Sequence, residues 1–356
     1  MARRPAPCPD RHSVTGSYTM IHRILVPLDG SVRAEAVLPH VMAVANAFNS
    51  RVDLLHVLPA AAVGDRHRPS DPMPCRLARA NRARYLESRA EVLRGFGLDV
   101  ETRIIEGGPA EVIVDLADRG EYDLVALTPH GVGQSTQLAI GCTAVAVLLN
   151  VRCSILLVAG YSPESEEAKT IPITYGGILS PVDCSPRSDW SLKVASDLAL
   201  GSGAHLQVIH VLDSPEVVSR MPRPGATRQL VESIIRANRT EAEEYLRSAT
   251  RRLVETGVSM ETQVLSGSTG GPAESVRSKA EGDGVDLVVL SAHGRGGAPA
   301  WPLGGVAMKL LLGIDRPVLV LQDVTAARTA WPRPAQESNR IRTHDSTLTG
   351  PFRAMR

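Results

Sequence analysis

The sequence of 356 residues has few aromatic side chains, an almost balanced charge and no paired cysteines. Aromatic residues make up 3% and the formal net charge is +1, which argues against base stacking and against attraction to nucleic acid or an anionic membrane. The five cysteines form no Cys-x-x-Cys pair, so neither a disulfide framework nor a zinc site is predicted. This cysteine usage favours a reducing, cytoplasmic location.

The chain also lacks a secretory signal and an uninterrupted membrane span. Residues 1–20 are charged and have no apolar stretch, so we expect a disordered leader, with Met20 as an alternative start. The apolar stretch 138–160 contains Asn150 and Arg152, and its counterpart later in the chain is interrupted by charges at the same place. A membrane span needs about 20 predominantly apolar residues, so both stretches are predicted to be a buried helix, a turn and a buried strand.

The sequence does contain an internal repeat. The apolar run that ends at Asp29 recurs at Asp183, and later motifs recur in the same order with one short insertion. The matched segments are 24–29 and 178–183, 55–57 and 209–211, 107–111 and 270–274, 123–125 and 286–288, and 130–131 and 293–294. Because the matches include loops after strands as well as apolar positions, they indicate a duplicated domain with one kind of site built twice.

Each copy alternates short apolar runs with longer amphipathic segments. Copy one is predicted to contain strands at 22–28, 51–57, 99–105, 123–128 and 153–158, and helices at 31–48, 76–95, 109–119 and 141–149. Copy two is predicted to contain strands at 176–182, 205–211, 258–265, 286–291 and 317–321, and helices at 186–201, 227–256, 272–281 and 304–313. This alternation predicts an α/β fold in which each copy has a parallel sheet with helices on both faces.

Changes in composition along the chain indicate the domain boundaries. We expect domains at 21–160 and 173–322, a polar linker at 161–172, and a disordered tail at 323–356 that is rich in Arg, Pro, Ser and Thr. Pro39 falls inside the first predicted helix and should kink it. Corresponding loops are predicted at 59–74 and 221–225.

The first candidate site residues are Asp29 and Asp183, at the ends of the first strand of each copy. A carboxylate at the carboxyl end of a parallel strand faces the crevice where open α/β sheets bind ligands, and it can accept hydrogen bonds from a ribose or a base. The alternative is a cap for the following helix. Ser31 and Ser185 offer caps of their own, which makes a capping aspartate partly redundant.

The second candidate is a glycine-containing loop after the fourth strand of each copy. In copy one, Gly131 is followed by nine residues and Gly141; in copy two, Gly294 is followed by nine residues and Gly304. Glycine lets backbone N–H groups approach a phosphate, and a helix N-terminus favours an anion. Arg295 adds a positive charge in copy two. The alternative is a tight turn that merely ends a strand.

Other residues carry weaker signals. The matched histidines have no carboxylate or cysteine beside them in ligand spacing, so we expect them to satisfy backbone groups and not to hold a metal. These histidines are His56, His130, His210 and His293. Cys142 at a predicted helix start is interpreted as a small packed residue, with a redox thiol as the alternative. No nucleophile and base recur in both copies, so the chain is not predicted to be an enzyme.

Together these motifs resemble the universal stress protein family, over about residues 21–160 and 173–322. The resemblance implies two tandem Rossmann-like or flavodoxin-like domains, each with a five-stranded parallel sheet in the order 3-2-1-4-5. It also implies a pseudo-dimer in which the last strands of the two halves meet. Nucleotide-binding members carry Gly-x-x-Gly, nine residues, then Gly-Ser or Gly-Thr, and this loop holds the phosphates of ATP with accompanying Mg²⁺.

The chain departs from that pattern in both copies. Thr128 and Ser291 replace the first glycine, and Cys142 and Gly305 replace the hydroxyl residue. A side chain at the first position would crowd the ligand if the backbone needed a positive φ there. The resemblance nevertheless implies candidate nucleotide contacts. They are Pro27, Asp29, Val57, Thr128, His130, Gly131, Gly141, Cys142 and Thr143 in copy one, and Pro181, Asp183, Val211, Ser291, His293, Gly294, Arg295, Gly304, Gly305 and Val306 in copy two.

The resemblance implies a role in stress-response signalling. Together with these residues it predicts a regulatory protein that binds ATP or another adenine nucleotide, is not a turnover enzyme, and acts on an unidentified protein partner. Copy two is the better predicted site because Arg295 offers a phosphate partner and Ser291 is small. The alternative is a family module without a nucleotide that acts through protein–protein contacts. Two chains could also pair as a homodimer of four domains.

Overall fold

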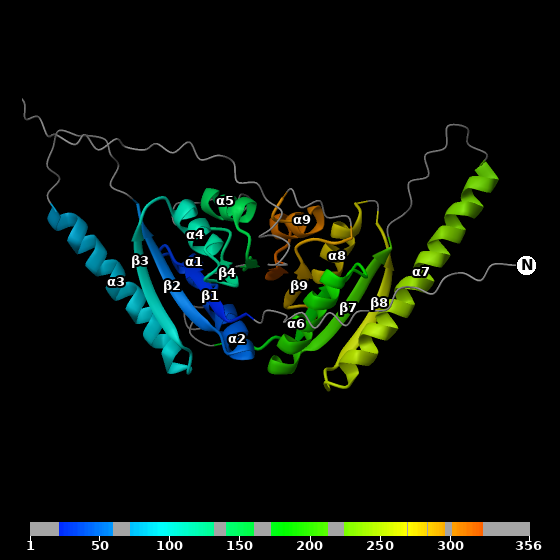
Figure 1. Ribbon diagram of the computed structural model, residues 1–356, viewed down its shortest axis with the longest axis horizontal. Coiled ribbons are helices and arrows are strands. Elements are labelled where there is room, and N and C mark those ends of the chain that lie inside the picture. Colours follow the sequence, from blue (N-terminus) through cyan, green and yellow to red (C-terminus); the bar gives the residue numbers. More distant parts are fainter. Residues whose placement is uncertain are drawn as a thin grey trace, which may run out of the picture.

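The computed structural model describes residues 21–59, 72–131, 140–159, 172–212, 224–268, 270–282, 284–295 and 301–322. Within these residues the two copies have the same succession of strands and helices, except that copy one has two helices after its first strand where copy two has one (Figure 1). Copy one contains β1 (Arg23–Pro27), α1 (Val32–Glu35), α2 (Leu38–Phe48), β2 (Arg51–Leu58), α3 (Pro72–Gly95), β3 (Val100–Glu106), α4 (Pro109–Asp118), β4 (Leu124–Leu127), α5 (Cys142–Asn150) and β5 (Ser154–Leu157). Copy two contains β6 (Gly177–Pro181), α6 (Pro186–Ser202), β7 (His205–Leu212), α7 (Pro224–Val254), β8 (Met260–Ser266), α8 (Pro272–Ala280), β9 (Leu287–Ser291), α9 (Gly305–Gly313) and β10 (Val318–Leu321).

All ten strands form one sheet, in the order β3-β2-β1-β4-β5-β10-β9-β6-β7-β8. Each half has the parallel order 3-2-1-4-5 that the family resemblance implies, and β5 pairs with β10 in antiparallel register. Each half thus has its predicted five-stranded parallel sheet, and the meeting of the two last strands is confirmed because it joins the two sheets edge to edge. Joining two fully buried apolar strands satisfies backbone groups that two open sheet edges would leave unpaired.

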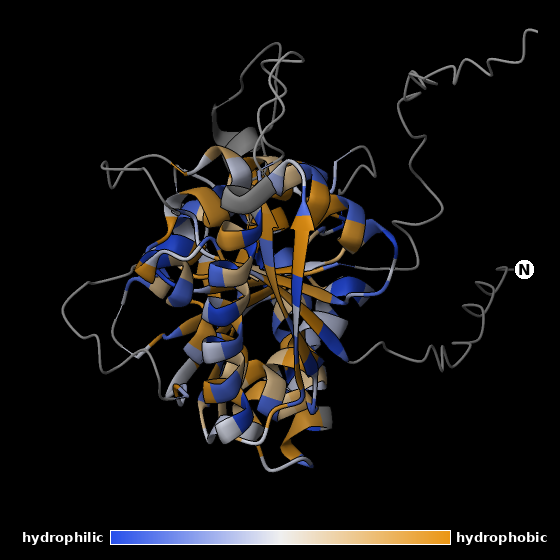
Figure 2. Ribbon diagram, turned by 90° about the vertical axis from the view of Figure 1, so that its left-hand side faces the viewer, coloured by the Kyte–Doolittle hydropathy of each residue, from blue (hydrophilic) through white to orange (hydrophobic). Residues whose placement is uncertain are grey.

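The core lies in two layers, one on each face of the sheet. Helices α2, α3, α6 and α7 cover one face, and α4, α5, α8 and α9 cover the other. Neighbouring residues of β1 alternate between the layers, since Ile24 and Val26 join the first and Leu25 the second. Strands buried on both faces are expected to be continuously apolar, and the central strands are mostly orange in Figure 2.

Three prolines at or near helix starts mark where the observed helix boundaries differ from the predicted ones. The predicted kink at Pro39 is a break, because α1 ends at Glu35 and α2 begins at Leu38 with Pro39 in its first turn. Helix α3 begins at Pro72 and α7 at Pro224, so residues predicted to end the two loops are helical. The remaining parts of those loops lie outside the described residues, as do the predicted leader, nearly all of the linker, and the tail.

The stretch that could be taken for a membrane span forms α5, a turn and β5 in its described part, as predicted. Among the described residues, no helix combines the length and apolar character needed to cross a bilayer.

Candidate functional site

The first-strand aspartates bind the turn that follows them and leave helix capping to serines. Asp183 Oδ1 accepts a hydrogen bond from the Ser185 amide at 3.1 Å, and Ser185 itself caps α6 in a capping box with Ser188. In copy one, Asp29 Oδ1 accepts from the Ser31 amide at 2.8 Å, and Ser31 caps α1. The capping interpretation of the aspartates is therefore wrong, because serine hydroxyls already accept from the helix amides.

The same aspartates hold the glycine loops in place. Asp183 Oδ2 accepts from the Arg295 amide at 2.5 Å, and a side chain at Gly294 would collide with that oxygen. In copy one, a side chain at Gly131 would collide with Asp29 Oδ2 in the same way. The lack of a side chain at the two glycines therefore allows each loop to lie close to the carboxylate. The end of the first strand and the loop after the fourth strand of each copy meet there.

The departures from the family pattern do not strain the loops. In the described chain the non-glycine residues with positive φ are Asn49 and Cys184, so neither Thr128 nor Ser291 has one. The Thr128 hydroxyl donates to the His130 carbonyl at 2.9 Å, and the Ser291 hydroxyl donates to the His293 carbonyl at 3.0 Å. Both hydroxyls thus close the turn internally.

The second glycine of each loop begins a helix, as predicted. Gly141 is the N-cap residue of α5 and Gly304 that of α9, and neither helix has a side-chain cap. Within the described chain, the amides of Gly305 and Val306 in α9 have no backbone acceptor. Uncapped amides at a helix N-terminus can donate to a bound anion.

The matched histidines mostly satisfy backbone groups, as expected. His56 Nδ1 lies 2.7 Å from the Leu28 carbonyl and His210 Nδ1 lies 2.8 Å from the Val182 carbonyl. His293 Nε2 lies 2.9 Å from the Trp301 carbonyl. His130 differs, because its buried Nδ1 has no partner among the described residues.

A cavity of about 640 Å³ lies at the carboxyl ends of β6 and β9, within the usual range for small-molecule sites. Most of the residues predicted for copy two line it. They are Pro181, Asp183, Val211, Ser291, Gly294, Arg295, Gly304, Gly305 and Val306. His293 is not part of the lining, since its ring turns to Trp301. The duplicated motifs therefore converge on one cavity in copy two.

The charged groups of this cavity are two carboxylates and one guanidinium. Burial by itself would raise the pKa of Asp183, but hydrogen bonds from Ser185 and Arg295 outweigh it and hold that pKa below its usual range. Arg295 Nη2 donates to the Cys184 carbonyl at 3.3 Å and lies 3.5 Å from Glu241. Asp183 is thus an ionised acceptor, while the Arg295 charge is shared with a carboxylate.

Several lining residues were not predicted from the sequence. Asn238, Glu241 and Ala242 enter from α7, which no motif indicated. Cys184 has a φ of 61° at the position where copy one has Gly30 with a φ of 88°. Its sulfur lies 3.6 Å from His210 Nδ1, and burial raises the pKa of the thiol to about 11. The mismatch between glycine and cysteine in the repeat was the signal that could have identified it.

In copy one the predicted residues lie in or just after β1, β2 and β4 and at the start of α5. Pro27 ends β1, Val57 lies in β2, and Thr128, His130 and Gly131 follow β4. Cys142 and Thr143 occupy the first turn of α5. Both side chains are exposed, so the expectation that Cys142 is a small packed residue is wrong. The arm between the two glycines lies mostly outside the described residues.

Comparison with known proteins places this geometry in a family. The model of the universal stress protein family matches residues 20–159 and 174–322. A universal stress protein of Mycolicibacterium smegmatis is 24% identical over 309 residues, which are 84% of this chain and 96% of that protein. One from Methanocaldococcus jannaschii is 25% identical over 146 residues, or 41% of this chain and 86% of that protein.

Solved structures show the same fold. A universal stress protein from Pseudomonas aeruginosa superimposes with a TM-score of 0.57 at 19% identity, covering 86% of this chain and 95% of its own. One from Archaeoglobus fulgidus gives 0.56 at 16% identity, covering 84% and 98%. Because the family model matches both copies, the chain belongs to the universal stress protein family and carries two tandem domains of that family.

Proposed function

We propose that the protein binds ATP or another adenine nucleotide in copy two and acts as a regulator in stress-response signalling. The observation that carries this proposal is the cavity at the carboxyl ends of β6 and β9, which joins the ionised Asp183 to the uncapped N-terminus of α9. Ligands of open α/β sheets bind at this edge of the sheet.

The residues present fit a nucleotide. The free amides of Gly305 and Val306 would donate to phosphate oxygens, and Arg295 would add a charged donor. Asp183 would accept from ribose hydroxyls, and apolar lining residues such as Val211 would contact the base. Mg²⁺ would accompany the phosphates and neutralise part of their charge. Losing the family's hydroxyl at position 305 removes one donor, whereas the backbone donor at that position remains.

The proposed role is regulatory and does not require catalytic turnover of the bound nucleotide. Occupancy would favour one arrangement of the loops beside Asp183, and a protein partner in the cytoplasm would bind that arrangement better. The antiparallel pairing of β5 with β10 already gives an intramolecular pseudo-dimer. Pairing of two chains into a homodimer would add a second such unit.

The test uses two glycines of α9. Gly305 lines the cavity and an added Cβ would meet nothing within 4 Å, so Gly305→Leu should fill the ligand space without disturbing the fold. Gly313 at the other end of α9 is equally uncrowded, which makes Gly313→Leu a matched control. ATP binding is measured by calorimetry on the full chain.

We expect Gly305→Leu to abolish ATP binding at the cavity of copy two and Gly313→Leu to leave that binding unchanged. Identical ATP titrations for the two variants would reject the nucleotide site in copy two. In that case the alternative of a family module acting through protein contacts alone would be preferred.

A further inference from the structure

The described sheet ends at β3 in copy one and at β8 in copy two (Figure 1). In a parallel pair, every second residue of a strand directs its N–H and C=O groups to the neighbouring strand, and the residues between direct theirs outward. The Ser259 carbonyl accepts a hydrogen bond from β7, and the Gly267 amide donates one to it. The backbone groups of Met260, Thr262 and Val264 in β8 therefore point away from the sheet.

In copy one, side chains of α3 cover the corresponding edge. Arg94 donates from Nε and Nη2 to the outward carbonyl of Val100, at 3.1 and 2.8 Å. Glu87, two turns earlier in α3, accepts from Arg94 Nη1 at 2.5 Å and fixes the guanidinium. The first outward carbonyl of β3 is therefore occupied, and covering an edge in this way protects it from a further strand.

Copy two has lost this cover. Helices α3 and α7 match at an offset of 160 positions, which also relates Gly97 and Gly257, the glycines with positive φ after the two helices. The position of Arg94 is thus taken by Val254, which is 59% exposed. In the described part of the chain the carbonyl of Met260, the first outward one of β8, has no hydrogen-bond partner.

A cavity of about 870 Å³ lies beside this uncovered edge, between α7 and β8. Its lining residues on α7 run from Arg239 to Val254, over which the helix rises about 23 Å. The 7 residues of β8 also span about 23 Å, so the helix side of the cavity is as long as the strand. The cavity shares no lining residue with the one that contains Asp183, and it is a separate site.

The charged residues of this cavity favour an anionic partner. The lining contains three arginines and two glutamates, which are Arg239, Arg247, Arg251, Glu243 and Glu255. Among the residues that the structure describes, neither Arg247 nor Arg251 has a hydrogen bond or an ion pair. Their counterparts in α3 are Glu87 and Glu91, so the helix reverses its charge beside the uncovered edge.

We propose that the edge of β8 is a docking site for an extended, acidic segment of a partner protein, which joins the sheet as a further strand. The outward N–H and C=O groups of β8 would pair with the backbone of the segment. Arg247 and Arg251 would bind its carboxylates through charge-assisted hydrogen bonds. The proposal goes beyond the proposed function, because docking at this edge does not require a nucleotide.

Charge favours this occupant over two others. The end segments of the chain itself are basic, since residues 323–356 contain six arginines and three acidic residues, and residues 1–20 contain three arginines and one aspartate. A second copy docked by two-fold symmetry would place the arginines of α7 opposite the same arginines, and like charges across an interface are unfavourable. An acidic segment of another protein meets neither obstacle.

The experiment measures the binding of a fluorescent peptide of about eight residues, alternating glutamate and valine, to the full chain without nucleotide. One control peptide has lysine in place of glutamate. A second has N-methyl groups on alternate backbone amides, which removes the donors for strand pairing and keeps the charge. By fluorescence anisotropy, we expect the acidic peptide to bind at least about tenfold more tightly than either control.

Val254→Arg restores the arginine that covers the edge in copy one. Added positive charge alone would strengthen the binding of an acidic peptide, whereas a guanidinium on the Met260 carbonyl should weaken it by about tenfold. Ser248→Arg is the matched control, because it adds the same charge at an exposed position of α7 about 120° around the helix from Val254. Arg247→Glu should weaken binding severalfold, as for a reversed surface charge.

The proposal would be overturned by no binding of the acidic peptide, by equal binding of either control peptide, or by tighter binding to the Val254→Arg chain. A dimer in sedimentation experiments that Val254→Arg dissociates would assign the edge to a second copy instead, and it would also overturn the proposal. The ATP affinity of the Val254→Arg chain should equal that of the parent, so failure at this edge is distinguishable from failure of the nucleotide site. Circular dichroism of each variant confirms that the fold is retained.

Discussion

At the scale of single residues, the backbone at Cys184 shows how one copy departed from the other. Cys184 keeps the left-handed conformation that glycine adopts without cost in copy one. Its sulfur lies 3.6 Å from His210 Nδ1, and the residue lines the cavity of copy two. The chain therefore tolerates backbone strain at a position that lines its best candidate site, which is where such strain is commonly found.

This strain leads to a prediction for two substitutions at the same position. Cys184→Gly should leave the free energy of unfolding within about 1 kcal/mol of the parent, because relief of strain offsets the lost thiol contacts. Cys184→Val should lower it by about 2 kcal/mol or more, since a β-branched side chain is disfavoured at positive φ. Urea denaturation of both variants checks the prediction, and a Val variant as stable as the Gly variant would contradict it.

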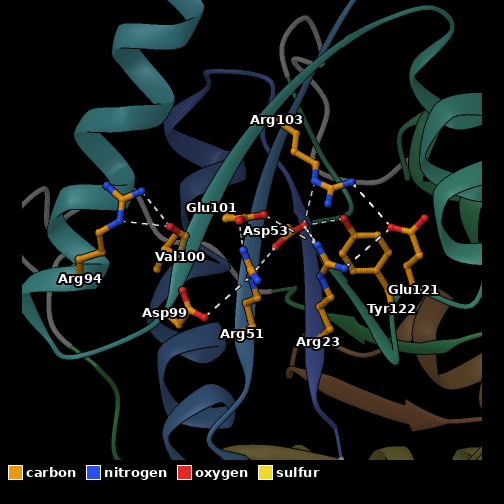
Figure 3. Close-up of polar contacts among 10 residues, drawn as sticks. All are labelled: Arg23, Arg51, Asp53, Arg94, Asp99, Val100, Glu101, Arg103, Glu121 and Tyr122. Atoms are coloured by element: carbon orange, nitrogen blue, oxygen red, sulfur yellow. Dashed lines mark hydrogen bonds and ion pairs between the residues drawn. The ribbon is translucent and has the colours of Figure 1, made fainter.

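At the scale of secondary-structure elements, the start of the copy-one sheet is held by a buried carboxylate. Asp53 of β2 is fully buried, and its Oδ2 accepts hydrogen bonds from Arg23 at 2.8 Å and Tyr122 at 2.7 Å (Figure 3). Arg103 of β3 pairs with the same oxygen at 3.0 Å, and Arg51 lies 3.7 Å from Oδ1. One carboxylate thus connects three neighbouring strands, whereas copy two has Gln207 at the same register position.

We predict that Asp53→Asn lowers the free energy of unfolding by about 3 kcal/mol, because three half-buried guanidinium groups lose the fully buried charge that they share. Asp99→Asn is the matched control. Asp99 is 71% exposed and lies 3.8 Å from Arg51, so its loss should cost no more than about 1 kcal/mol. Chemical denaturation measures both, and equal small effects would show that the Asp53 cluster contributes little to stability.

At the scale of the whole molecule, a polar contact helps to join the two halves. His40 of α2 lies with its Nδ1 3.0 Å from the hydroxyl of Tyr175, which precedes β6. Burial lowers the pKa of His40 to about 4, although the charge of Asp286 acts in the opposite direction. The imidazole is therefore neutral at the interface between the copies.

Because the pKa of His40 is lower in the folded state than in the unfolded chain, its stabilising contribution is present above about pH 6.5. It should be lost progressively as the pH falls toward 4, by up to about 3 kcal/mol. His40→Gln keeps a hydrogen-bonding group but removes the titration. We expect the difference in unfolding free energy between the parent and this variant to change in favour of the variant as the pH falls from 7 to 4. A constant difference over that range would contradict the assignment.

The sequence by itself determined the duplication, the alternation of strands and helices, and the convergence of Asp183, Gly294 and Gly304 on one strand edge. The duplication is visible by comparing the sequence with itself, and the other features depend on local pattern and on the geometry of parallel strands. Helix starts at Gly141 and Gly304 were predictable for the same reason.

Only the tertiary structure decided the antiparallel join of β5 with β10, the cluster around Asp53, and the placement of Ala242 beside the cavity of copy two. In each case the partners are far apart in the chain and belong to different elements. Their contact depends on how helices pack across the sheet and how two sheet edges pair, and no local propensity or spacing in the sequence encodes that packing.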